Sequence, residues 1–109
     1  MISKKVYALL KKIKLQDCTY DNQSLEIIAR AGASGQQVLI YRDHARYYFK
    51  AIGSPYLLAM SKWLMTQLQA KEMQTLADID IAKLQQTFDL PTHKRQDALV
   101  ILQLIEQLQ

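Results

Sequence analysis

The sequence has 109 residues, half of them apolar, which is enough for one domain (residues 1–109) with its own hydrophobic core. No apolar run is as long as a membrane span, and lysines interrupt the apolar residues near the N-terminus, so we expect neither a transmembrane helix nor a signal peptide. The single cysteine, Cys18, excludes an internal disulfide framework and favours a reducing compartment. We therefore expect a cytoplasmic protein, either a monomer or a dimer.

The positive charge is concentrated in two segments. The formal net charge is +4 and the isoelectric point is about 9.2. Lysines crowd residues 1–14, and His93, Lys94 and Arg95 form a second group. A basic protein invites a nucleic-acid interpretation. However, the sequence contains no recognition-helix pattern and no RNP motif, and the N-terminal lysines alternate with an apolar stripe. We prefer the solvated face of an amphipathic helix, and nucleic acid is not the expected partner.

The first half of the chain predicts a helix followed by three strands. Val6, Leu9 and Ile13 recur at helical spacing, with lysines on the opposite side. After a polar linker, the stretches SLEIIARA, QQVLIYR and ARYYFKAI are rich in β-forming residues. Their connections are short, and one of them contains Gly32 and Gly35. Short connections between adjacent strands predict an antiparallel meander.

A glycine–serine–proline step separates the predicted sheet from the helical half of the chain. Ser54 is suited to be the N-cap of a helix that has Pro55 at its first position. Trp63 belongs to the apolar side of this helix, and we expect it to be buried between the helix and the sheet.

Two further helices are predicted after that one. Thr75 or Asp78 is placed to cap the first of them, Pro91 to end it, and Thr92 to cap the last helix. Strands followed by helices that cover one face of the sheet define an α+β two-layer sandwich. We therefore predict an N-terminal helix, a three-stranded antiparallel sheet and C-terminal helices packed on one face.

Residues that carry catalysis are scarce. The sequence contains no Walker loop, no G-x-G-x-x-G, no H-E-x-x-H and no C-x-x-C. His44 and His93 are far apart in the sequence, and solvated surface histidines are the preferred interpretation. Tyr41, Tyr47 and Tyr48 would offer a stacking surface on the sheet, but packing is the commoner role of aromatic residues in strands. We do not expect an enzyme.

Three short motifs follow one another along the chain. It opens with SKKVYALLKK, carries FKAIGS at the end of the third predicted strand, and has DLPTHK, with Leu90, Pro91 and Lys94, before the last helix. In this order the chain resembles the IscU/NifU N-terminal family of iron–sulfur cluster scaffolds, over nearly its whole length. That family's first helix often begins S-E-K-V, and its chaperone-recognition motif is L-P-P-V-K. The resemblance implies a SufE/NifU-like form of the α+β fold.

The resemblance also implies where metal ligands would stand. Members of the family hold a [2Fe–2S] cluster or zinc with three cysteines and a nearby aspartate and histidine, because soft thiolates suit these metals. A C-G-D step falls on Ser34 to Gln36, the second cysteine on Ser54, and an H-C step on Gln96 and Asp97. None of these residues carries sulfur, and a serine hydroxyl is a poor ligand at neutral pH. We therefore expect no metal and no other cofactor.

Cys18 does not replace the missing cysteine ligands. It lies in the linker before the first predicted strand, and one thiolate with one carboxylate and two hydroxyls would still make a weak site. The serines are nearly isosteric with cysteine, so Ser34 and Ser54 can preserve the shape of the loops without metal. The resemblance thus implies a protein with the fold of a scaffold but without the ligands that bind a cluster.

The function that we expect is a role in iron–sulfur cluster assembly, as an accessory or partner-binding protein without a competent cluster site. The resemblance implies a cysteine desulfurase or an Hsp70-type chaperone as partner, and a partner-binding surface at Leu90, Pro91, Lys94 and Arg95. The alternative is a non-catalytic binding module outside that pathway, which uses the basic N-terminal helix against an acidic protein or nucleic acid. A sulfur-acceptor role like that of SufE ranks third, because it requires a cysteine where this chain has Ser34.

Overall fold

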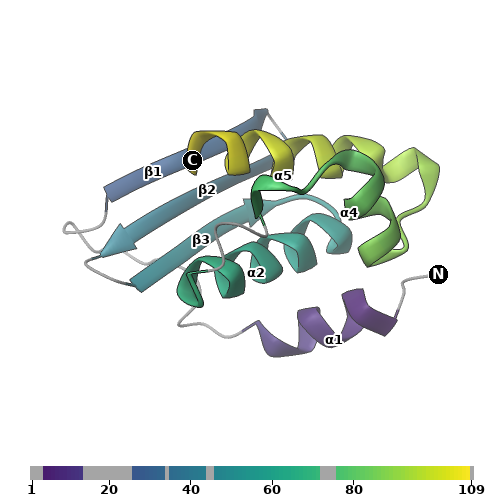
Figure 1. Ribbon diagram of the computed structural model, residues 1–109, viewed down its shortest axis with the longest axis horizontal. Coiled ribbons are helices and arrows are strands. Elements are labelled where there is room, and N and C mark those ends of the chain that lie inside the picture. The colour runs from purple at the N-terminus through teal and green to yellow at the C-terminus, as the bar shows by residue number, and fades with distance from the viewer. Residues whose placement is uncertain (1–3, 14–25, 34, 44–45, 72–75, 109) are drawn as a thin grey trace.

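The structure is a computed structural model that describes residues 4–13, 26–33, 35–43, 46–71 and 76–108. Figure 1 shows one helix, a sheet and a set of C-terminal helices. The elements are α1 (Lys4–Lys12), β1 (Glu26–Ala33), β2 (Gln36–Asp43), β3 (Arg46–Ile52), α2 (Pro55–Gln69), α4 (Ile81–Phe88), a 3-10 turn η2 (Thr92–Lys94) and α5 (Arg95–Leu108).

The sheet is the predicted antiparallel meander. Its strand order is β1-β2-β3, and both neighbouring pairs run antiparallel. A register shift between Ile27 and Ala29 interrupts the first pair, while the second pair runs without interruption from Gln37 opposite Ile52 to Arg42 opposite Tyr47. The register matters here because it decides which side chains face the helices.

The helices cover one face of this sheet. Helix α2 packs against β3 and α5 against β1, while α1 packs against α2 (Figure 1). The strands present apolar side chains to these helices: Ala29 and Ala31 from β1, Val38 and Ile40 from β2, and Phe49 from β3 are all buried. The α+β two-layer arrangement with one covered face is therefore confirmed.

Helix α2 begins as the sequence predicts. Ser54 has an extended backbone, and its side chain accepts a hydrogen bond of 3.3 Å from the backbone N–H of Leu57, with Pro55 at the start of the helix. Trp63 is buried, with 9% of its surface exposed. The ring that meets it belongs to Phe88 of α4, in an edge-to-face contact with 5.5 Å between centroids. This part of its environment therefore comes from a helix and not from the sheet.

The boundaries of the later helices differ from the prediction. Asp78 does not cap α4, because the helix begins later and Asp80 accepts a hydrogen bond of 2.8 Å from the backbone N–H of Lys83. Thr75 lies outside the described residues. Helix α4 ends at Phe88, where Asp89 adopts a left-handed conformation with φ of 53°. The chain thus leaves the helix through this residue before it reaches Pro91.

Thr92 does not cap the last helix either. The backbone N–H of Lys94 donates to the carbonyl of Pro91 at 2.9 Å, so a 3-10 turn precedes α5 and Thr92 is the first residue inside it. Pro91 takes the cap position and offers no side-chain hydrogen bond. The three basic residues of this segment therefore occupy the turn and the first position of α5.

Two glutamine side chains satisfy backbone groups at the edges of the sheet. The amide of Gln107 accepts from the N–H of Arg30 at 2.9 Å and donates to its carbonyl at 2.7 Å, as a neighbouring strand would. At the other edge, Gln69 accepts from the N–H of Tyr47 at 2.6 Å. Unpaired edge groups favour pairing between chains, and these contacts satisfy such groups at one residue of each edge strand.

Within the part of the chain that the structure describes, no helix is both long enough and apolar enough to cross a membrane.

Candidate functional site

Three polar residues from three different elements meet at one end of the sheet. Gln36 opens β2, Ser54 stands at the start of α2, and Asp97 lies in the first turn of α5. Figure 1 shows that the end of β1, the start of β2, the end of β3 and the start of α5 lie at this same end. Residues separated by 43 and 61 positions in the sequence are thereby brought into contact. We call these three residues the polar cluster.

Asp97 is the acceptor at the centre of the polar cluster. The hydroxyl of Ser54 donates to Oδ2 of Asp97 at 2.5 Å, and the side-chain amide of Gln36 donates to Oδ1. Asp97 is 3% exposed, whereas Ser54 and Gln36 are half-buried. Each carboxylate oxygen therefore has a donor, as a buried carboxylate requires.

Local backbone geometry brings Gln36 to this position. Gly32 has φ of +97° and Gly35 has φ of +85°, conformations that glycine adopts without strain. A Cβ on Gly32 would also collide with the carbonyl oxygen of Gln36. The ends of β1 and β2 can therefore approach each other this closely only with glycine at position 32. This close approach places Gln36 beside α5.

Asp97 lies at the N-termini of two helices. Ser54 is the N-cap of α2, a helix of 15 residues, and Asp97 itself lies in the first turn of α5, a helix of 14 residues. The exposed N–H groups at helix N-termini carry partial positive charge and stabilise carboxylates. The hydroxyl of Ser54 both caps α2 and binds Asp97, because it accepts a hydrogen bond from the backbone of α2 and donates one to Asp97.

The donor set of the polar cluster does not fit an iron–sulfur cluster or zinc. It offers one carboxylate, one hydroxyl and one amide, and no thiolate or imidazole. Among the residues that the structure describes, no three His, Cys, Asp or Glu side chains gather in a way that could hold a metal ion. The cluster is suited to join β2, α2 and α5 through hydrogen bonds.

Most positions that the resemblance assigned to ligands are accounted for. Gln36, Ser54 and Asp97 come together, while Gln96 is exposed although it is adjacent to the buried Asp97. Ser34 lies outside the described residues, as do Cys18 and His44.

The residues assigned to partner binding differ in accessibility. Leu90 is 8% exposed and belongs to the core, and its backbone N–H donates to the carbonyl of Gln85 at 2.9 Å. Pro91 and Lys94 are half-buried, and Arg95 is exposed. A partner that docks on the folded chain therefore meets Arg95 and parts of Lys94 and Pro91, whereas Leu90 faces the interior.

Helix α1 carries the basic surface of the alternative interpretation. Val6 is fully buried, whereas Lys11 and Lys12 are exposed. The ammonium of Lys11 lies 4.6 Å from the centroid of the Tyr7 ring, and Tyr7 is 55% exposed. The helix thus has one apolar side against α2 and one cationic side toward solvent.

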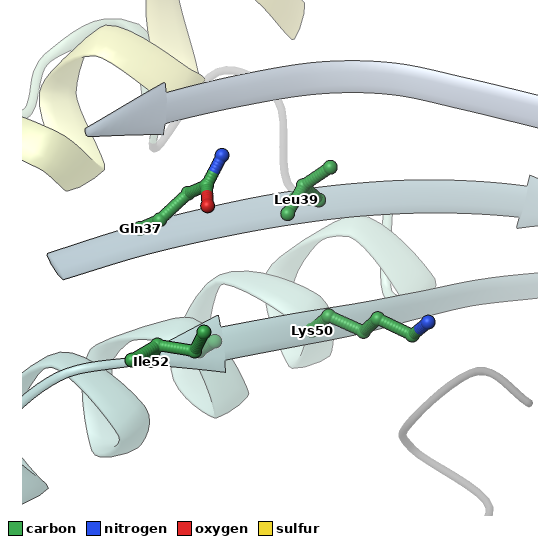
Figure 2. Close-up of a pocket in the computed structure, with 5 residues that line it drawn as sticks. Gln37, Leu39, Lys50 and Ile52 are labelled. Atoms are coloured by element: carbon green, nitrogen blue, oxygen red, sulfur yellow. The ribbon is translucent and has the colours of Figure 1, made fainter. Parts of the chain in front are cut away.

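The sheet also has a surface hollow that was not predicted from the sequence. A pocket of about 340 Å³ is lined by Gln37, Leu39, Lys50, Ala51 and Ile52 (Figure 2). The sequence contains part of the information, because alternation along β2 and β3 places Leu39, Lys50 and Ile52 on the face opposite the buried residues. Only the pairing register, however, shows that these side chains are neighbours.

No protein-family model matches the chain, and no curated protein matches it.

Proposed function

We propose that this protein is an accessory, partner-binding member of an iron–sulfur cluster assembly system, with a scaffold-like fold and without a competent cluster site, acting in the cytoplasm. One observation carries the proposal. The resemblance assigns ligand positions to residues far apart in the sequence, and three of these, Gln36, Ser54 and Asp97, meet in one hydrogen-bonded cluster. Proximity of these three residues is what the ligand positions of that family require.

The chemistry of the polar cluster supports an accessory role. A scaffold must release its cluster, so its ligands have to be exchangeable and its loops able to rearrange. Here Asp97 joins two other elements through direct hydrogen bonds, which favour one fixed arrangement. The function that we propose therefore depends on the surface that includes Lys94 and Arg95, which follow Leu90 and Pro91 in the sequence.

Binding to purified partners tests this proposal. The chain is titrated with the cysteine desulfurase and, separately, with the Hsp70-type chaperone of the same organism, by isothermal calorimetry. We expect saturable binding to the desulfurase that an ordinary scaffold competes away, and no cluster assembly on the chain in an anaerobic reaction with iron, cysteine and desulfurase. Absence of binding to both partners would refute the proposal.

A pair of charge-reversal variants separates the proposal from its alternative. Lys94→Glu with Arg95→Glu changes the surface beside the polar cluster, and Lys11→Glu with Lys12→Glu changes α1 by the same charge. Both pairs consist of residues that are at least partly exposed, so both variants are expected to fold. Loss of desulfurase binding with the first pair alone supports the proposal. Loss with the second pair alone, or binding of an unrelated acidic protein instead, supports a basic-helix binding module.

A further inference from the structure

The face of the sheet turned away from α2 and α5 has a regular arrangement of side chains. The pairing register places its residues in three rows across the strands: Gly32, Gln37 and Ile52; Arg30, Leu39 and Lys50; Ile27, Tyr41 and Tyr48. We call these nine residues the outer face. Two of them, Ile52 at 63% and Ile27 at 48%, are the most exposed large aliphatic side chains in the described part of the chain. They stand at opposite corners of the outer face, with Leu39 in the row between them, so apolar side chains extend across this face.

The middle row combines an apolar centre with two cations. Leu39 lies directly opposite Arg30 on one side and Lys50 on the other. Within the described part of the chain, neither cation is paired with a carboxylate. None of the nine residues is acidic. The next pair along these strands, Asp43 and Arg46, adds one residue of each sign, so the net charge on this side of the sheet is positive.

The hollow beside Leu39 is suited to an apolar side chain. Figure 2 shows Gln37, Leu39, Lys50 and Ile52 on neighbouring strands, with helices behind the sheet. The pocket of about 340 Å³ is open and is lined mainly by aliphatic groups, including the stem of Lys50. A leucine-sized side chain placed there would lie among Leu39, the stem of Lys50 and Ile52.

We propose that the outer face binds an acidic segment of a partner protein, with one large aliphatic side chain in the hollow beside Leu39 and carboxylates that reach Arg30 and Lys50 on the two sides of Leu39. Strands are about 4.8 Å apart, so the two cations flank Leu39 at about that distance on either side. In an extended peptide, alternate side chains are about 6.6 Å apart. In a segment that crosses the strands, residues i and i+4 are about 13 Å apart, and the strands of Arg30 and Lys50 are about 9.6 Å apart. The long side chains of Arg30, Lys50 and two glutamates span this difference while residue i+2 enters the hollow.

Single-stranded nucleic acid fits this face less well. Binding of that kind uses aromatic rings on which bases stack. Here the ammonium of Lys50 lies 5.9 Å from the Tyr41 centroid, and the guanidinium of Arg46 lies 5.5 Å from that of Tyr48. Both rings already have a cation over one side, and the lining of the hollow is mainly aliphatic.

The probe is the acetylated and amidated peptide STETLTETS, whose Glu, Leu and Glu share one side when it is extended. It is titrated into the ¹⁵N-labelled full chain at up to about 1 mM, the range of weak affinities. Companion titrations use STQTLTQTS, STETGTETS and an eight-nucleotide oligothymidylate. We expect shifts of the Leu39, Lys50 and Ile52 amides with the first peptide, and affinities weaker by about tenfold for the other two peptides.

Variants complete the test. Lys50→Glu should weaken binding of STETLTETS by about tenfold, while Lys83→Glu, the same charge change on exposed α4, should leave it unchanged. Equal binding of all three peptides, shifts confined to α1, tighter binding of oligothymidylate, or no shifts with any probe would each overturn the proposal. The outer face shares no residue with the polar cluster, so its failure leaves the proposed function untouched.

Discussion

Ser54 donates a hydrogen bond of 2.5 Å to Asp97, a residue 43 positions later in the sequence. The bond joins the N-cap of α2 to the first turn of α5, the two helices that cover the sheet. With the amide of Gln36 on the other carboxylate oxygen, it also fixes the start of β2. Asp97 thus connects both layers of the fold at one end of the sheet.

Asp97→Ala should lower the free energy of unfolding by about 1.5–3 kcal/mol, the range for buried hydrogen bonds to a charged group. The substitution leaves the hydroxyl of Ser54 and the amide of Gln36 without their acceptor. Glu106→Ala, at an exposed position of the same helix, should change it by less than about 0.5 kcal/mol. Urea denaturation of both variants measures the difference. Equal effects would show that Asp97 is not a structural acceptor.

Trp63→Ala should cost about 3–5 kcal/mol, as for other large core truncations. The ring is 9% exposed and meets the ring of Phe88, so its removal leaves a cavity between α2 and α4. Tyr7→Ala, which removes a ring that is 55% exposed, is the matched control. A cost for Trp63→Ala below about 1 kcal/mol, typical of surface positions, would contradict this packing.

Gln107→Ala should accelerate hydrogen exchange of the Arg30 amide by about five- to tenfold, since one side-chain hydrogen bond contributes about 1 kcal/mol. The Gln107 side chain is the partner of both backbone groups of Arg30. Gln103→Ala, at an exposed glutamine of the same helix, should not change this exchange rate. If both substitutions act alike, the glutamine does not protect the edge of β1.

The fold class was predictable because each element has a strong local signal. The alternation in ARYYFKAI predicted β3, and Ser54 with Pro55 predicted the start of α2 at the correct residue. Helix boundaries were less predictable where several residues could cap. Asp78 and Asp80 are equivalent in type, and only the path of the chain decides that Asp80 is the N-cap.

The polar cluster was only partly predictable. The resemblance placed Gln36, Ser54 and Asp97 at related positions, but no local pattern tells that Asp97 is buried and accepts two hydrogen bonds. Contacts over such separations depend on how the layers pack, which a single sequence does not express. For the same reason Leu90 was assigned to a partner surface, whereas in the folded chain it packs in the core.

The peptide DLPTHKR should bind an Hsp70-type chaperone more weakly than the same peptide with Thr92→Pro and His93→Val. Consecutive prolines favour the extended conformation that a peptide groove holds, and Pro91 followed by Thr92 keeps only part of this bias. The intact chain should bind more weakly still, because Leu90 has to leave the core. Fluorescence anisotropy measures all three affinities, and equal affinities for the two peptides would contradict this argument.

Zinc binding by a variant with the ligand types of the resembled family is the most direct test of whether the polar cluster occupies the ligand positions of a scaffold. The variant combines Ser34→Cys, Gln36→Asp, Ser54→Cys and Asp97→Cys, and its controls each keep one of Ser34, Ser54 and Asp97 unchanged. Three thiolates and a carboxylate at one place suit a tetrahedral zinc site. We expect one zinc per chain in the variant, thiolate absorption with cobalt in its place, much weaker binding by each control, and no stoichiometric iron or zinc in the natural chain. A variant that folds, by circular dichroism, but binds no zinc would contradict the assignment of the polar cluster to the ligand positions of a scaffold.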